Sequence, residues 1–148
     1  MIQATSGETD ALVRAIGEAF GSVASVRAAL LFGSQARGTA RVDSDIDVAV
    51  LLDRDTALSE RSVLVRTLIM ALGEKLRSDR VDVVILNDAP PKLAFHALSE
   101  GRVALERDPI DLHRFRLRTW ARHADYAPVE RFFRQAVKDR AMRGAAGG

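Results

Sequence analysis

The chain has 148 residues, of which 47% are hydrophobic and none is cysteine, and its formal net charge is +2. This length suits one domain that buries its own core, and the lack of cysteine excludes disulfide frameworks and cysteine-ligated metal sites. Because no apolar run is long enough to span a membrane and the first ten residues do not form a secretion signal, we expect a cytoplasmic protein without membrane contact.

The first third of the chain predicts one helix and two strands. Thr9 is suited to cap the helix and Gly21 to end it. Residues 26–32 are apolar almost throughout, which is typical of a strand covered on both faces. In residues 46–52 one face is wholly apolar, whereas the other begins with Asp47 and then becomes apolar. This pattern predicts a sheet that packs on helices and opens into a site at one end.

The middle of the chain continues the alternation of helices and strands. An apolar stripe predicts a packed helix over residues 57–77. Residues 81–86 form an apolar strand that contains one acid, Asp82. Pro90-Pro91 starts a short helix, and residues 102–106 follow it as a short edge strand.

The C-terminal part predicts two helices and a tail. Asp108-Pro109 is a strong helix start, and Tyr126-Ala127-Pro128 is expected to interrupt the helical segment. The expected inner face of the first helix consists of Ile110, Leu117, Trp120, Ala121 and Ala124. The second helix has an apolar stripe that can form an interface with a second copy or a partner, made of Val129, Phe132, Phe133, Ala136 and Val137. We therefore expect a core over residues 1–108, helices over residues 109–140 that pack on the core or a partner, and a disordered tail over residues 141–148.

Charge is distributed unevenly along the chain. Residues 1–106 carry 12 basic and 15 acidic side chains, whereas residues 107–148 carry 10 basic and 5 acidic ones. A basic C-terminal part can serve an acidic partner or nucleic acid. A helix with a solvated arginine face is the commoner origin of such a cluster, so nucleic acid is not the expected partner.

Residue types suited to a metal-bound triphosphate gather between the first two predicted strands. Gly33 has no Cβ to keep a phosphate away from the backbone. The Ser34 hydroxyl and the free N–H groups of a helical turn over residues 35–38 offer hydrogen-bond donors to anionic oxygens. Asp45 and Asp47 lie two residues apart at the start of the second strand, so their carboxylates point to one face and can share Mg²⁺.

Asp82 is the candidate for a third metal ligand. An acid near the start of an apolar strand is costly to bury unless its charge is compensated, and a metal ion would compensate it. The alternative is an aspartate at the surface, or one that pairs with Arg77 or Arg80.

The spacing of these residues resembles a known family. Gly33-Ser34, ten residues and then Asp45-Ile46-Asp47 match the signature of polymerase-beta-type nucleotidyltransferases. Ala36-Arg37-Gly38 and Ser44 are similar to the minimal nucleotidyltransferases in particular. The resemblance covers residues 26–107. It implies an α+β (mixed α/β) fold of the polymerase-beta-like type, in which a small mixed sheet packs with helices and carries a helical C-terminal extension.

The resemblance also implies roles for the candidate residues. Asp45, Asp47 and Asp82 would be catalytic and would hold two Mg²⁺ ions during attack on the α-phosphorus of a nucleoside triphosphate. Gly33, Ser34 and Arg37 would bind the phosphates of ATP, with Arg37 neutralising the developing pyrophosphate charge or else pointing to solvent.

The expected acceptor comes from the family alone. Minimal nucleotidyltransferases are antitoxins encoded beside a HEPN-domain toxin, so the resemblance implies transfer of AMP from ATP to a tyrosine hydroxyl of a cognate HEPN ribonuclease. The chain would then form a hetero-oligomer with the toxin, or a homo-oligomer. One alternative is a non-catalytic antitoxin or scaffold that neutralises its partner by binding. Another is an adenylyltransferase that modifies a small molecule such as an aminoglycoside.

Overall fold

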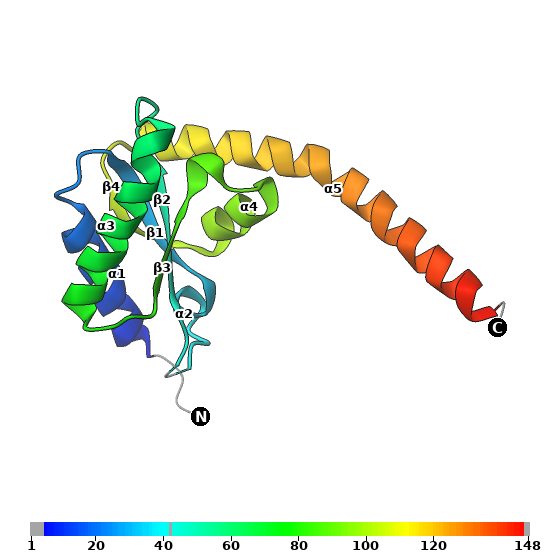
Figure 1. The fold of residues 1–148 in the computed structure, drawn as a ribbon, viewed down its shortest axis with the longest axis horizontal. Coiled ribbons are helices and arrows are strands. Elements are labelled where there is room, and N and C mark those ends of the chain that lie inside the picture. Colours follow the sequence, from blue (N-terminus) through cyan, green and yellow to red (C-terminus); the bar gives the residue numbers. More distant parts are fainter. Residues whose placement is uncertain (1–4, 42, 147–148) are drawn as a thin grey trace.

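The computed structural model describes residues 5–41 and 43–146 (Figure 1). Its centre is a four-stranded mixed sheet with the strand order β3-β2-β1-β4. The strands are β1 (Val26–Phe32), β2 (Ile46–Leu52), β3 (Val81–Ile85) and β4 (Arg102–Glu106). The central strand β1 is antiparallel to β2 and β4, whereas β2 is parallel to β3. The predicted strands are confirmed, except that the third ends one residue earlier.

Helices cover both faces of the sheet. The helices are α1 (Ser6–Phe20), α2 (Gly33–Arg37), α3 (Leu58–Leu76), the 3-10 turn η1 (Leu86–Asp88), α4 (Pro91–Glu100) and α5 (Pro109–Ala146). Figure 1 shows α1 and α3 on one side of the sheet and α4 with the start of α5 on the other. Among the described residues, no helix is both long enough and apolar enough to cross a membrane.

The apolar strands supply two cores because their side chains alternate between the two faces. Towards α1 and α3, the buried residues include Ile16, Phe20, Ala29, Leu31, Val48, Val50, Leu68 and Leu72. Towards α4 and α5, they include Ala28, Leu30, Ala49, Leu51, Ala94, Leu98 and Leu112. Both faces of β1 and β2 are therefore covered along most of their length, as their composition predicts, and only one end of β2 carries an acid.

The first helix begins earlier than predicted. Thr5, not Thr9, is its N-cap: the Thr5 hydroxyl accepts the Glu8 N–H at 3.2 Å, and the Glu8 carboxylate accepts the Thr5 N–H at 2.6 Å. This reciprocal pair is a capping box, which the Thr-x-x-Glu spacing already indicates in the sequence. Thr9 is buried instead, and its hydroxyl donates to the carbonyl of Gln35 at 3.2 Å. The prediction that Gly21 ends the helix is confirmed.

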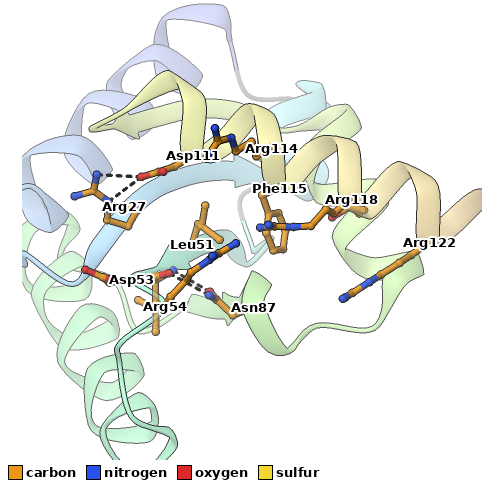
Figure 2. A pocket seen from close by; sticks show the side chains of 12 residues that line it. Arg27, Leu51, Asp53, Arg54, Asn87, Asp111, Arg114, Phe115, Arg118 and Arg122 are labelled. Carbon is orange, nitrogen blue, oxygen red and sulfur yellow. Dashed lines mark hydrogen bonds and ion pairs between the residues drawn. The ribbon is translucent and has the colours of Figure 1, made fainter.

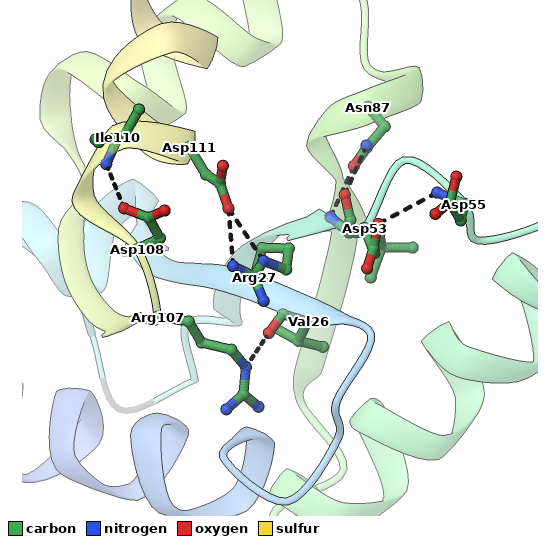
Figure 3. Close-up of polar contacts among 10 residues, drawn as sticks. Val26, Arg27, Asp53, Asp55, Asn87, Arg107, Asp108, Ile110 and Asp111 are labelled. Carbon is green, nitrogen blue, oxygen red and sulfur yellow. Dashed lines mark hydrogen bonds and ion pairs between the residues drawn. The ribbon is translucent and has the colours of Figure 1, made fainter.

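Polar contacts attach the start of α5 to the sheet (Figure 3). The Arg107 guanidinium donates to the carbonyl of Val26 at 2.6 Å. Asp108 accepts a backbone N–H of the first turn at 3.0 Å and so caps α5, as predicted. One turn further on, Asp111 forms an ion pair with Arg27 of β1 at 3.0 Å. These contacts fix which face of α5 meets the domain.

The buried face of α5 is not the predicted one. Ile110, Leu117 and Trp120 are 55%, 51% and 40% exposed, and Ala121 and Ala124 are exposed as well. The side chains that pack inward are Leu112 and Thr119, which are 0% and 5% exposed. Helical spacing identifies apolar stripes but not the buried one, and in the structure Leu112 packs into the core beside α4.

The C-terminal half of α5 extends away from the sheet (Figure 1). The helix runs through Pro128 to Ala146, so the predicted interruption at residues 126–128 is wrong, and residues 141–146 are helical rather than disordered. Residues 147–148 of the predicted tail lie outside the described residues. A proline inside a helix removes one hydrogen bond and crowds the preceding turn, which accounts for the change of direction visible in the orange part of the ribbon.

Candidate functional site

Strand pairing brings the candidate carboxylates to one end of the sheet. Asp47 of β2 is the register partner of Asp82 on the parallel strand β3, and of Phe32 at the end of β1. Asp45 lies directly before β2. Asp47 is half-buried, whereas Asp45 and Asp82 are exposed. Three residues that are up to 37 positions apart therefore share one edge of the molecule.

Electrostatic interaction links the three acids. Burial raises the pKa of Asp47 above its ordinary value, the carboxylates of Asp82 and Asp45 raise it further, and the Arg37 guanidinium lowers it. A cation bound among these groups would relieve this repulsion, and Mg²⁺ prefers carboxylate oxygens. The donor set therefore fits a magnesium site. Within residues 5–41 and 43–146, no three acidic or histidine side chains are already gathered closely enough to hold one ion.

Position 33 requires glycine for two reasons, its backbone conformation and the close approach of the Asp47 side chain. Its φ angle is +73°, a left-handed conformation that side chains rarely adopt. A Cβ on Gly33 would lie 2.5 Å from Oδ2 of Asp47. From the sequence, we expected this glycine to let a phosphate approach the backbone. The structure adds that it leaves room for the half-buried carboxylate.

Ser34 stands at the start of α2, directly after β1. Its carbonyl accepts the N–H of Thr39 at 3.0 Å, and Gly38, in the left-handed conformation, ends the helix after five residues. In the described part of the chain, no hydrogen bond occupies the Ser34 hydroxyl. That hydroxyl is therefore available to an anionic oxygen near Gly33.

Arg37 lies between the acids and α4. Its guanidinium pairs with the carboxylate of Glu100 at 2.9 Å, and its side chain is 49% exposed. It also contributes to the electrostatic surroundings of Asp47, whose pKa it lowers. The sequence did not indicate Glu100, because the two residues are 63 positions apart and no local pattern links them.

Neither of the two arginines considered as partners of Asp82 pairs with it in the part of the chain that the structure describes. Arg80 donates to the carbonyl of Asp43, and Arg77 is the left-handed C-cap of α3 with φ 52°. Across the described residues, neither arginine forms an ion pair with Asp82. The ion-pair alternative for Asp82 is thus not found, which leaves an exposed carboxylate beside Asp47.

The loop before β2 is held from two sides. The Ser44 hydroxyl accepts the Arg41 N–H at 2.8 Å, and the Ser44 N–H donates to the Arg41 carbonyl at 3.0 Å. The Ile46 N–H donates to the Arg80 carbonyl at 2.7 Å, which joins the start of β2 to β3. Sequence reasoning noticed Ser44 only as part of a motif. Its role in closing the turn places Asp45 at the mouth of the strand.

Comparison with known proteins agrees with this geometry. Residues 15–110 match the family model described as polymerase beta, nucleotidyltransferase, and this range contains every candidate site residue. Over 107 residues, the chain is 30% identical to the protein adenylyltransferase MntA of Aphanizomenon flos-aquae (strain 2012/KM1/D3), which covers 69% of this chain and 71% of that protein.

Solved structures show the same fold. A crystal structure of a toxin–antitoxin with AMP-PNP matches with a TM-score of 0.68 and 27% identity, covering 88% of this chain and 98% of that chain. A tri-AMPylated Shewanella oneidensis HEPN toxin in complex with MNT antitoxin matches with a TM-score of 0.63 and 24% identity, covering 90% and 98%. The family match covers the sheet, the acids and the Gly33 turn together. This chain therefore belongs to the polymerase beta nucleotidyltransferase family.

Proposed function

We propose that this chain is a metal-dependent protein adenylyltransferase that transfers AMP from ATP to a tyrosine hydroxyl of a HEPN-domain toxin and thereby acts as its antitoxin. The observation that carries the proposal is the placement of Asp45, Asp47 and Asp82 at one end of the sheet, beside the Gly33 turn. Support for the acceptor comes from relatives: one is named a protein adenylyltransferase, and another was solved with an AMPylated toxin.

Each residue has a role in this chemistry. Asp45, Asp47 and Asp82 would hold two Mg²⁺ ions, which when bound stabilise negative charge on phosphate oxygens and acidify an attacking hydroxyl. The Ser34 hydroxyl donates to a phosphate oxygen, and Arg37 neutralises the departing pyrophosphate. Asp82, on the edge strand β3 and open to solvent, accepts the proton of the tyrosine hydroxyl as that oxygen bonds to phosphorus.

The test is mass spectrometry of a HEPN-domain protein encoded beside this chain, after incubation with the chain, ATP and Mg²⁺. We expect a mass increase of one or more AMP groups on a tyrosine. The increase should disappear with excess chelator and with Asp45→Asn, which removes one acidic ligand at an exposed position without burying a new group. Unchanged labelling under either condition would contradict the proposed chemistry.

The projecting half of α5 offers a surface for this partner. Phe133 and Val137 are 62% and 69% exposed, and with Ala136, Arg140 and Arg143 they form an open patch along one side of the helix. Phe133 follows the buried Thr119 by two seven-residue steps, so it lies on the same side of the helix as the residues that pack inward in the first half of α5. The side chain of Val129, in the same predicted stripe, lies outside the described part. We therefore assign this face to the toxin.

Substitution of that face should weaken the complex without unfolding the chain. Phe133→Ser is expected to reduce toxin binding by about tenfold or more, because exposed aromatic residues are common anchors of interfaces. Met142→Ser is the matched control: Met142 is 70% exposed and lies nine residues further along, on the opposite side of the helix. Binding can be measured by titration calorimetry. Equal loss in both variants would argue against a specific face.

Neutralisation by binding alone is the second candidate, and the same exposed face favours it. The Asp45→Asn chain distinguishes the two candidates in cells that express the toxin. If this variant binds the toxin but no longer protects, transfer is needed for protection. If it protects fully, binding is sufficient and the proposed role of transfer in neutralisation fails.

A further inference from the structure

A polar pocket lies at the other end of β2 from the acids (Figure 2). Its volume is about 520 Å³, and it is bounded by the start of β1, the end of β2, η1 and α5. Its residues include five arginines but only two aspartates: Arg27, Arg54, Arg114, Arg118 and Arg122 with Asp53 and Asp111. Leu52, in its wall, is five strand residues from Asp47, or roughly 17 Å along β2. The pocket is therefore separate from the transfer site.

The walls of the pocket are held by specific hydrogen bonds. The Asn87 side chain pairs with the backbone of Leu52 through both of its polar atoms, accepting the N–H at 2.9 Å and donating to the carbonyl at 3.0 Å. Arg27 and Asp111 pair at 3.0 Å and hold α5 against β1. These contacts join β2, η1, β1 and α5, so the pocket is formed by anchored elements rather than by a free loop.

The remaining four arginines carry more charge than the one remaining acid of the pocket, Asp53, can balance. Arg114, Arg118 and Arg122 follow one another at four-residue spacing on α5, where like charges destabilise a helix. Among the described residues, Arg54, Arg114 and Arg122 form no ion pair. The guanidinium of Arg118 lies 5.8 Å from the centre of the Phe115 ring.

Arginines face the pocket from two elements. Figure 2 shows Arg54 extending from the loop after β2 towards α5, and Arg122 extending back from α5. Successive arginines of α5 are separated by about 6 Å of helical rise, so linked phosphate groups can contact more than one of them. A guanidinium fork binds phosphate oxygens in pairs. A bound anion would offset the repulsion among these side chains.

We propose that this pocket binds a small molecule that carries linked phosphates, of the class of nucleoside diphosphates and triphosphates. Its volume lies in the range of roughly 300–1,000 Å³ that is usual for small-molecule sites. The arginines recognise the phosphate chain, and the apolar side chains of Leu51 and Phe115 offer a wall for the base. The proposal concerns a site other than that of adenylyl transfer and stands independently of it.

The experiment is titration calorimetry of the full chain in excess chelator, with inorganic triphosphate and ATP as separate probes. We expect at least one probe to bind. The double variant Arg118→Gln, Arg122→Gln should weaken that binding by about tenfold or more, since two charge-assisted contacts are lost. Arg66→Gln, at an exposed position on α3 across the sheet, is the matched control for charge and should bind as the parent does.

Asp47→Asn separates this site from the transfer site. Binding that survives Asp47→Asn but not the double variant supports the pocket, whether or not the chain adenylylates a toxin. If ATP binds more tightly than triphosphate, we infer that the pocket also contacts the nucleoside. If the two bind equally, the phosphates alone are recognised. The proposal is overturned if neither probe binds or if Arg66→Gln weakens binding equally. It is also overturned if a short single-stranded RNA, titrated as a third probe, is the only one of the three that binds. The last outcome would assign the arginines to a nucleic-acid backbone.

Discussion

Gly33→Ala is expected to reduce adenylyl transfer strongly, whereas Gly38→Ala should preserve it. Both glycines have a φ angle of +73°, so alanine at either position costs about 1–2 kcal/mol of folding stability. Their surroundings differ. A Cβ at position 33 would lie 2.5 Å from Oδ2 of Asp47, while a Cβ at position 38 has nothing within 4 Å. The carboxylate of Asp47 can turn away from the new methyl group, and it then leaves the position from which it would hold a metal ion.

The pair of variants separates backbone strain from damage to the site. Thermal unfolding should show similar losses of stability for Gly33→Ala and Gly38→Ala. Transfer of AMP, followed by mass spectrometry, should fall by about 100-fold or more for Gly33→Ala, since a misplaced group that stabilises transition-state charge has effects of that size. Near-normal transfer by Gly33→Ala would mean that Asp47 does not act from the observed position. Equal loss in Gly38→Ala would assign the effect to strain in α2.

Asp47→Asn should make the metal-free chain more stable at neutral pH and catalytically inactive. Burial and the neighbouring carboxylates raise the pKa of Asp47 above the ordinary 3.8. The folded chain therefore holds this proton more tightly than the unfolded chain does. The protonated Asp47 side chain therefore stabilises the folded chain. This stabilisation is fully present below pH 3.8 and is lost as the pH rises through the raised pKa of Asp47. Asparagine has the same shape but does not ionise, so the Asp47→Asn variant does not lose stability in this way.

The measurement is the unfolding midpoint from below pH 3.8 up to neutral pH, with chelator and then with Mg²⁺. The advantage of Asp47→Asn over the parent should grow as the pH rises. Mg²⁺ should raise the midpoint of the parent, because a ligand that binds only the folded state stabilises it, and should raise that of the variant much less. Asp55→Asn removes one charge at the opposite end of β2 and serves as the control. Lower stability of Asp47→Asn at neutral pH would contradict the electrostatic description of the site.

Local patterns in the sequence predicted most of the fold. Residues 26–32 and 46–52 form strands with those bounds, because an apolar run and a two-residue alternation are properties of neighbouring residues. The Gly33-Ser34 turn and the acids were found in the same way, from their spacing. The start of α1 was missed although its capping box is visible in the sequence, since Thr9 stood closer to the apolar stripe.

The errors in α5 have a different origin. Its exposed stripe, with Leu117 and Trp120, is as regular as the buried one that contains Leu112 and Thr119. Periodicity identifies faces of a helix but not which face meets the domain. Contacts with residues far away in the sequence show that face: Leu112 is buried in the core beside α4, and Asp111 pairs with Arg27, 84 positions away. Pro128 predicted an end to the helix, yet a proline at a solvent-exposed position can be accommodated by a bend.

The sequence by itself determined the order of helices and strands up to α5, the candidate acids and the resemblance to the family, because these depend on neighbours along the chain. Only the tertiary structure decided what lies across from each residue. It placed Asp82 beside Asp47, the Asp47 carboxylate against Gly33, and Arg37 beside Glu100. It also gathered arginines from β1, the loop after β2 and α5 into one pocket. Such contacts join residues that are tens of positions apart, and they arise only when the sheet and its helices pack together.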